Sequence, residues 1–396
     1  MHEPSANRIK NRLRPLWQGW ITFLLSASLL LAGCAPSQAP SQAPPPAPAP
    51  QTPPASATPA STTPKETPVT TNATASPVPA STPEPSATIT PEPTTPAPAL
   101  RQVNIAIPLM DMTAAERYKG EDGGLYGGGL NAPPAHHREA ALKALAEVKP
   151  LDANGAPSPE GKIVLVSLGM SNTTQEFSVF KKLADADPEK SPNLRIVDGA
   201  QGGQTALIWA TKDDPWRVLE QRLSATGVTP QQVQIIWAKQ ANAQPKNAFP
   251  AEAKALQEHL AIIVRRIKER YPNVKVVYLS SRTYGGYATT ALNPEPHAYE
   301  SAFAIRWLIQ SQIDGNADLN FDLNTGPVVS PLLLWGPYLW ADGTNPRSDK
   351  LVWERSDFVE TDRTHPSDSG RTKVAKLLLD FFKKNELARA WFLKPR

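Results

Sequence analysis

A short apolar run, Ile163 to Leu168, constrains the fold of this chain more than any other stretch. Five of its six residues are apolar, a composition and length typical of a strand buried on both faces, as in a parallel sheet. Gly169 ends the run and Ser171 follows two residues later. Ligands bind at the carboxyl ends of the strands in open α/β sheets, so Ser171 would stand where the chemistry of such a sheet takes place. By itself the residue decides nothing, because most serines at strand ends satisfy a turn or cap a helix.

Strand-like and helix-like segments alternate around this run. Four further apolar segments are predicted strands: Leu194–Asp198, Val233–Trp237, Val274–Leu279 and Val328–Leu334. Five segments are predicted helices: His136–Val148, Pro215–Gly227, Ala251–Tyr271, Tyr299–Ile313 and Ser367–Lys384. The alternation favours right-handed βαβ units, and therefore an α/β domain over residues 101–396 whose mostly parallel sheet is covered by helices on both faces.

The preceding stretch, residues 35–100, has a composition that cannot form such a core. It holds 20 of the 43 prolines and no aromatic residue. Of its other 46 residues, 34 are Ala, Ser or Thr. A segment of this kind cannot bury enough apolar surface to offset the entropy of ordering it. We expect a disordered, extended tether rich in polyproline II.

Residues 1–34 have the pattern of a bacterial lipoprotein signal peptide. Basic residues precede an apolar run from Ile21 to Ala32, which is too short to span a bilayer comfortably. The run ends in Leu-Ala-Gly-Cys34, similar to a lipobox, and Cys34 is the only cysteine. We expect lipidation at Cys34 and an exported protein held on a membrane, facing the periplasm or the cell exterior.

The far end of the domain supplies the partners that a nucleophilic serine requires. A hydroxyl is a weak nucleophile and needs an adjacent base, which a carboxylate orients. Asp362 and His365 are three residues apart, so both can face one side of a tight turn. A single Asp-x-x-His pair is usually structural. Its weight here comes from its combination with Ser171.

In order and placement, these segments resemble the sequence blocks of the SGNH hydrolase superfamily, the GDSL-type esterases. Gly169-Met-Ser171 resembles the nucleophile block, with Met170 where Asp is usual, and Gly202-Gly203-Gln-Thr205 resembles the second block. Asp362-Arg-Thr-His365-Pro-Ser closely matches the last block, whereas the third block, usually Gly-x-Asn-Asp, is replaced by Lys-Gln240-Ala-Asn242. The resemblance covers most of residues 160–385.

The resemblance implies a three-layer α/β/α, flavodoxin-like fold and a serine esterase that needs no metal or organic cofactor. Ser171 would be the nucleophile, His365 the base and Asp362 its orienting carboxylate. The oxyanion would be met by the Ser171 and Gly203 amides and by the side chain of Asn242 or, if the strand ends are aligned, of Gln240.

Other residues after predicted strands are candidates for substrate binding. Trp335 and Trp340 could form a stacking platform for a sugar ring, although aromatic residues are more often core. Arg282 and Tyr284 follow a strand and could line a pocket, with a structural role equally open. The segment Asp314–Asp322 alternates oxygen-bearing side chains but lacks the glycine and glutamate of a calcium loop, so we interpret it as a solvated turn.

Two functions of different classes remain open. The first is a surface-anchored esterase for small acyl esters, for example acetyl groups on polysaccharide or cell-wall glycan. The second is a non-catalytic glycan-binding or scaffolding lipoprotein, which Met170 and the altered third block favour. A serine more than about 5 Å from the imidazole would favour the second function. A net charge of +4 without basic clusters interleaved with aromatics gives no indication of nucleic-acid binding.

Overall fold

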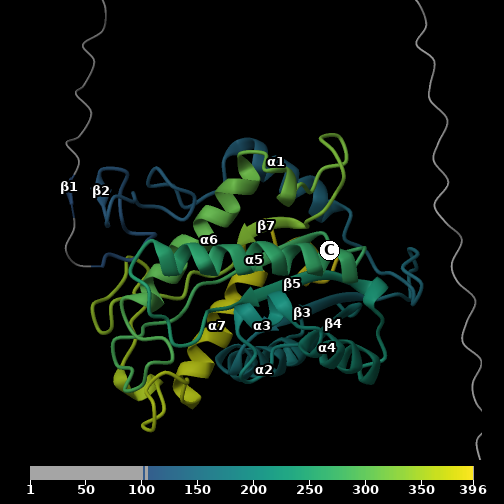
Figure 1. Cartoon of the computed structure of the whole chain (residues 1–396). Helices are drawn as coiled ribbons and strands as arrows, with labels where there is room; N and C mark the ends of the chain where they lie inside the picture. Colours follow the sequence, from purple (N-terminus) through teal and green to yellow (C-terminus); the bar gives the residue numbers. More distant parts are fainter. Residues whose placement is uncertain (1–100, 103–105, 396) are drawn as a thin grey trace, which may run out of the picture. The chain divides into compact units, whose positions relative to one another are not determined.

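The computed structural model describes residues 101–102 and 106–395 (Figure 1). The predicted signal peptide, Cys34 and the tether lie outside the described residues. Within them, no helix is both long and apolar enough to cross a membrane.

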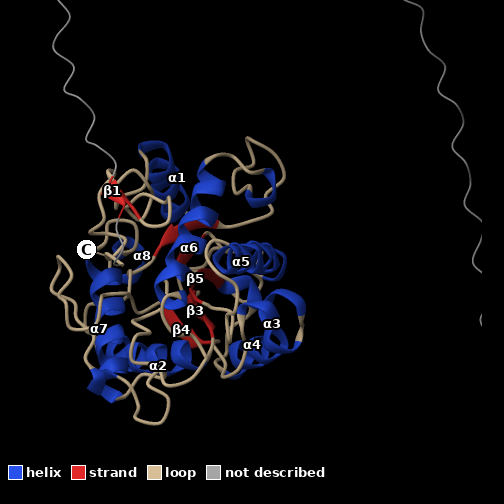
Figure 2. Cartoon of the chain, turned by 60° about the vertical axis from the view of Figure 1, so that its left-hand side comes forward, coloured by secondary structure: helices blue, strands red, loops and turns tan. Residues whose placement is uncertain are grey.

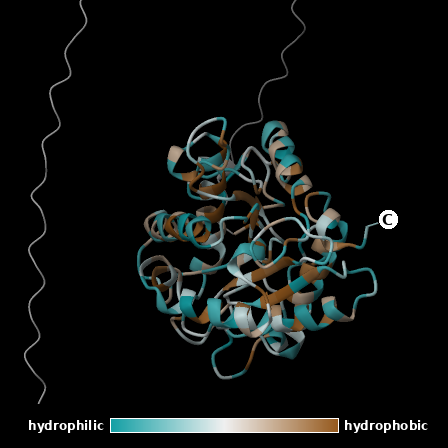
Figure 3. Cartoon of the chain, turned by 90° about the vertical axis from the view of Figure 1, so that its right-hand side faces the viewer, coloured by the Kyte–Doolittle hydropathy of each residue, from teal (hydrophilic) through white to brown (hydrophobic). Residues whose placement is uncertain are grey.

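A five-stranded parallel sheet in the order β4-β3-β5-β6-β7 forms the centre of the domain. Its strands are β3 (Ile163–Gly169), β4 (Leu194–Asp198), β5 (Val233–Lys239), β6 (Val276–Leu279) and β7 (Leu332–Trp335). Every residue of β3, β5, β6 and β7 is buried, and Figure 3 shows these strands as a hydrophobic centre among more hydrophilic helices. This confirms the expected mostly parallel sheet. A separate two-stranded ladder joins β1 (Arg101–Gln102) and β2 (Glu116–Arg117).

Helices cover both faces of the sheet, which confirms the three-layer α/β/α architecture (Figure 2). The helices are α1 (Ala135–Ala146), α2 (Ser171–Ala186), α3 (Ala206–Thr211), α4 (Asp214–Ala225), α5 (Ala251–Arg270), α6 (His297–Ile313), α7 (Asp368–Lys384) and α8 (Arg389–Phe392). Helices α3, α4, α5 and α6 pack in one hydrophobic core, and α1, α2, α7 and α8 in the other. Three short 3₁₀ helices are Pro230–Gln232, Ala317–Leu319 and Arg355–Asp357.

Side-chain periodicity explains why these helices form where they do. Phe177, Phe180 and Ala184 recur on one face of α2 and are fully buried, while Leu256 and Leu260 begin the buried stripe of α5. Each helix therefore buries one face against the sheet, and the loops that follow the strands are left to carry polar residues.

The structure differs from the elements predicted from the sequence in two details. The last strand begins at Leu332 and not at Val328. Pro331 lies directly before it, and a proline cannot donate a ladder hydrogen bond, so pairing starts only after this residue. The short helix α3, which sequence patterning does not predict, begins where Thr205 caps the amide of Ile208.

Candidate active site

The structure brings Ser171, His365 and Asp362 into one hydrogen-bonded chain. Ser171 Oγ lies 2.7 Å from His365 Nε2, and His365 Nδ1 lies 2.6 Å from Asp362 Oδ2. With a proton on Nδ1 donated to the carboxylate, Nε2 is free to accept the serine proton. This is the arrangement of a nucleophile, a base and an orienting acid.

A tight turn places Asp362 and His365 on the same side of the chain. Arg363 has a φ of 48°, which reverses the backbone between the two residues. Asp362 Oδ1 accepts hydrogen bonds from the backbone amides of Thr364 and His365, at 2.8 and 2.9 Å. Burial opposes ionisation of Asp362, but these bonds and that of the His365 side chain outweigh burial and hold its pKa below its ordinary value.

Hydrogen bonds on two sides hold α2, the helix that carries Ser171, in place. Ser171 is the first residue of α2, directly after the extended Met170, so its backbone amide points out of the helix N-terminus without an intrahelical partner. Asn172 Nδ2 donates to the Thr364 carbonyl at 2.8 Å, which ties the nucleophile helix to the histidine turn. On the other side, Asp198 at the end of β4 accepts hydrogen bonds from the hydroxyls of Thr174 and Ser178.

The glycines expected to help bind an oxyanion lie beside this turn. The backbone amide of Gln201 donates to the Gly169 carbonyl at 3.0 Å, which holds the loop after β4 against the end of β3. A Cβ added to Gly202 would lie 3.9 Å from the Ser171 Cβ. A Cβ added to Gly203 would have no heavy atom of the described residues within 4 Å. Gly203 has a φ of +76°, a conformation that favours glycine. A side chain at Gly202 would thus point towards Ser171, whereas one at Gly203 would point into open space.

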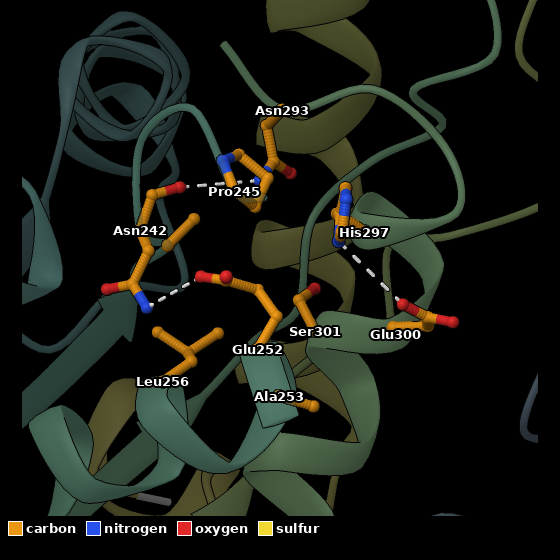
Figure 4. Close-up of a pocket in the computed structure, with 10 residues that line it drawn as sticks. Asn242, Pro245, Glu252, Ala253, Leu256, Asn293, His297, Glu300 and Ser301 are labelled. Atoms are coloured by element: carbon orange, nitrogen blue, oxygen red, sulfur yellow. Dashed lines mark hydrogen bonds and ion pairs between the residues drawn. The ribbon is translucent and has the colours of Figure 1, made fainter. Parts of the chain in front are cut away.

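Asn242 and Gln240, the alternative side-chain donors, differ in their partners. Asn242 Nδ2 donates to Glu252 Oε1 at 3.3 Å, and its Oδ1 lies 2.9 Å from His259 Nδ1. Figure 4 shows the Asn242 amide directed at Glu252, beside a cavity of about 20 Å³. Gln240 is 2% exposed, and neither atom of its side-chain amide has a hydrogen-bond partner among the described residues. The Gln240 amide is thus buried without a partner there, while the Asn242 amide binds Glu252 and His259 of α5.

The structure contradicts the expectation of an exposed aromatic platform. Trp335 and Trp340 are 5% and 1% exposed and pack in the hydrophobic core. Trp335 Nε1 donates to the Leu125 carbonyl at 2.6 Å and Trp340 Nε1 to Glu295 at 2.7 Å. Both indole N–H groups have hydrogen-bond acceptors inside the domain, so both rings can be buried. Neither ring is therefore exposed for stacking on a sugar.

Arg282 and Tyr284 follow β6 as expected but differ in exposure. Arg282 is 3% exposed, and its Nε and Nη1 have no hydrogen-bond partner within the part of the chain that the structure describes. Tyr284 is partly buried, with its ring 5.0 Å from that of Tyr287 and 6.1 Å from that of Trp340. Burial raises its pKa. Only Tyr284 has the exposure that a surface contact with a substrate would need.

A buried ion pair between α2, the helix that begins with Ser171, and the strand β5 was not predicted from the sequence. Lys239 Nζ lies 2.6 and 2.5 Å from the two carboxylate oxygens of Glu176, and both side chains are fully buried. Burial lowers the pKa of Lys239 to about 8, against the attraction of Glu176. Asn172 and Glu176 were missed because their partners lie 192 and 63 residues away, and nothing in the local pattern indicates such contacts.

The described residues contain no group of three or more His, Cys, Asp or Glu side chains placed to hold a metal ion. In the segment Asp314–Asp322, Asn316 Oδ1 accepts from the Asp318 amide and Asn320 Oδ1 from the Asp322 amide. These oxygens therefore cap turns of the segment itself.

Comparisons with known proteins give distant structural similarity only. No protein-family model and no curated protein sequence matches the chain. A Bacillus subtilis protein of solved structure shares 11% identity over 58% of this chain and 58% of its own, with a TM-score of 0.33. A carbohydrate esterase family 3 protein from Talaromyces cellulolyticus shares 14% identity over 54% of this chain and 93% of its own, with a TM-score of 0.28. The periplasmic domain of a Salmonella ser. Paratyphi A lipopolysaccharide acetyltransferase shares 11% identity over 62% and 94%, with a TM-score of 0.30.

Proposed function

We propose that this protein is a serine-dependent hydrolase of small carboxylic esters. The observation that supports the proposal is the unbroken chain of hydrogen bonds from Ser171 Oγ through His365 to Asp362, at 2.7 and 2.6 Å. A binding or scaffolding role requires no base at hydrogen-bond distance from a serine, so this geometry favours the enzyme over the non-catalytic alternative.

In the proposed reaction, Ser171 Oγ forms a bond to the ester carbonyl carbon as its proton moves to His365 Nε2. The carbonyl π electrons move onto oxygen. When the tetrahedral intermediate collapses, the bond to the alcohol breaks and His365 returns the proton to the leaving oxygen. Water then attacks the acyl-enzyme as His365 takes its proton, the bond between Ser171 Oγ and the acyl carbon breaks, the acid leaves, and His365 returns the proton to Ser171 Oγ. Asp362 keeps Nδ1 protonated and stabilises the imidazolium, without itself taking the proton.

The oxyanion would be met by the Ser171 backbone amide at the N-terminus of α2, by an amide of the Gly202–Gly203 loop, and by the Gln240 side chain. The 16-residue helix adds its positive dipole at the same end. We choose Gln240 over Asn242 because, among residues 101–102 and 106–395, its side-chain amide has no hydrogen-bond partner.

Hydrolysis of a p-nitrophenyl acetate, propionate and butyrate series tests the proposal. We expect activity from a chain of residues 101–396, and a loss of at least about 10³-fold in the Ser171→Ala variant. Ser369→Ala is a matched control, because Ser369 Oγ caps the turn at Ser356 and Asp357, outside the proposed machinery. Equal activity in Ser171→Ala and the parent chain would refute the mechanism.

We further propose that the enzyme is a membrane-anchored lipoprotein whose substrates are acyl groups, such as acetyl, on envelope glycans. This rests on the lipobox-like sequence at Cys34 and not on the aromatic residues, which are buried. In a bacterial host we expect the full chain in the membrane fraction and the Cys34→Ala form out of it, with unchanged ester hydrolysis. Fractionation that leaves Cys34→Ala in the membrane would contradict lipidation as the anchor.

A further inference from the structure

Gly202 differs from every other glycine in the part of the chain that the structure describes. A chain needs glycine where φ is positive or where a side chain would collide with a neighbour. Each of the other described glycines has a φ between +20° and +160°, or a Cβ added to it would lie less than 3.0 Å from another heavy atom. Gly202 meets neither condition, because its φ lies outside that region and the nearest atom to an added Cβ is 3.9 Å away. The fold itself therefore does not require glycine at this position.

Three other glycines at the candidate site have structural reasons of this kind. A Cβ on Gly169 would collide with Thr173, and one on Gly199 would lie 2.5 Å from a methyl group of Leu219. Gly203 has a φ of +76°. These three glycines shape the turns after β3 and β4, so their lack of a side chain gives no information about a ligand.

The space that Gly202 leaves open lies beside the candidate nucleophile. Gly202 is exposed. Apart from its neighbours in the chain, the Ser171 Cβ is the only heavy atom of the described residues within 4 Å of a Cβ added to Gly202. A small side chain would therefore fit without strain. A glycine that neither the backbone nor the packing requires is typical of a position where a ligand approaches the chain closely.

The proposed reaction indicates which part of an ester faces this space. The leaving oxygen takes its proton from His365, so the alcohol lies beside the imidazole that contacts Ser171 Oγ at 2.7 Å. No atom of His365 lies within 4 Å of a Cβ added to Gly202. The acyl group, in contrast, stays bonded to Ser171 Oγ between the two steps of the reaction. The space beside Gly202 is therefore better placed for the acyl group than for the alcohol.

We infer that Gly202 determines the size of the acyl group that the candidate site accepts, because its missing side chain leaves room for the acyl chain beside Ser171. The inference rests on the proposed esterase function and adds a specificity-determining residue to it. Gly202 transfers no proton, and its backbone amide remains when a side chain is added. Each carbon atom added at this position should shorten the acyl chain that fits.

Substitutions that add one or three carbon atoms at this position test the inference. We expect Gly202→Val to lower the ratio of kcat/KM for p-nitrophenyl butyrate to that for the acetate about 10-fold or more, with a smaller decrease in Gly202→Ala. The Tm of Gly202→Ala should equal or exceed that of the parent chain, because alanine fits there and restricts the unfolded chain more than glycine does. Differential scanning calorimetry measures this.

Two controls separate acyl selectivity from other effects. Phenyl acetate and 2-naphthyl acetate share the acyl group and differ in the alcohol, so the ratio of their kcat/KM values should stay within about twofold of the parent ratio in both variants. Gly227→Ala is the matched glycine control. Gly227 follows α4 with a φ of +72° and has open space around an added Cβ. This substitution should lower the Tm and leave the butyrate-to-acetate ratio unchanged.

An unchanged butyrate-to-acetate ratio in Gly202→Val would overturn the inference, as would a change confined to the two aryl acetates. If Gly202→Val does not fold, an unchanged ratio in Gly202→Ala has the same meaning. An equal loss of activity with acetate, propionate and butyrate would also contradict it, because a role in acyl size requires an unequal loss. Activity that survives in Ser171→Ala would instead refute the esterase proposal itself, so that variant is measured first.

Discussion

At the scale of single residues, the candidate site depends on the hydrogen bonds of a few polar atoms. Asp362 accepts three hydrogen bonds, two from backbone amides and one from His365. The Asp-x-x-His spacing could be read from the sequence because the partners are local. The choice between Asn242 and Gln240 could not, because it depends on Glu252 and His259 of α5, which bind Asn242.

Replacing Asp362 with Asn should keep the shape of the turn but remove the acceptor that fixes the His365 tautomer. We expect kcat to fall about 10³- to 10⁴-fold with little change in KM, measured on the same acetate ester. The Asp342→Asn variant, on a loop outside the hydrogen-bonded chain, serves as control. A kcat for Asp362→Asn within tenfold of the parent value would contradict the assigned role.

The depressed pKa of Asp362 also predicts a pH dependence of stability. Because its folded pKa lies below the unfolded one, the ionised carboxylate stabilises the fold above the unfolded pKa, near ~4. This contribution is lost as pH falls through the lower, folded pKa. Urea unfolding at pH 7 and at pH 3 should therefore show a stability gap between parent and Asp362→Asn that narrows at the lower pH. A gap that widens on acidification would reverse the assigned sign.

At the scale of elements, the strands and long helices follow from local periodicity, and the bounds of β4 and α5 differ from the predicted ones by at most one residue. The error at Trp335 and Trp340 has a different origin. Their burial depends on the Leu125 carbonyl and on Glu295, which are supplied by loops distant in sequence. Aromatic residues after a strand could not be assigned to core or surface without those partners.

The ion pair that joins α2 to β5 gives a prediction at this scale. Glu176→Gln leaves a fully buried lysine without its carboxylate, so we expect a loss of about 3–5 kcal/mol in the free energy of unfolding. Asp185→Asn removes the surface ion pairs of Asp185 with Lys181 on the same helix and with Lys190, and should cost less than about 1 kcal/mol. Urea denaturation measures both. Equal losses of unfolding free energy in the two variants would show that burial does not increase the contribution of the Glu176–Lys239 ion pair to stability.

At the scale of the whole molecule, every described element lies within residues 101–395. The alternation of strands and helices was enough to predict the layers, because a parallel sheet requires cover on both faces. Sequence separation limited the rest: Ser171 and His365 are 194 residues apart, and only the chemistry of a serine with a base and the resemblance of their sequence blocks to one family indicated that they meet.

If residues 35–100 are a tether, removing them should leave the folded domain unchanged. We expect a chain of residues 101–396 to unfold cooperatively, with a Tm within about 2 °C of the chain that begins at residue 35. Differential scanning calorimetry of the two proteins measures this. A markedly lower Tm for the shorter chain would show that the proline-rich stretch packs on the domain.

Because Ser171 and His365 are 194 residues apart along the chain, they are synthesised at different times. A ribosome completes the serine and its helix long before it adds the histidine, and α7 follows directly after it. Before His365 is added, the Ser171 hydroxyl lacks the base that the proposed mechanism assigns to it. If the proposed mechanism holds, a half-made or C-terminally clipped copy would lack the base and would not hydrolyse esters.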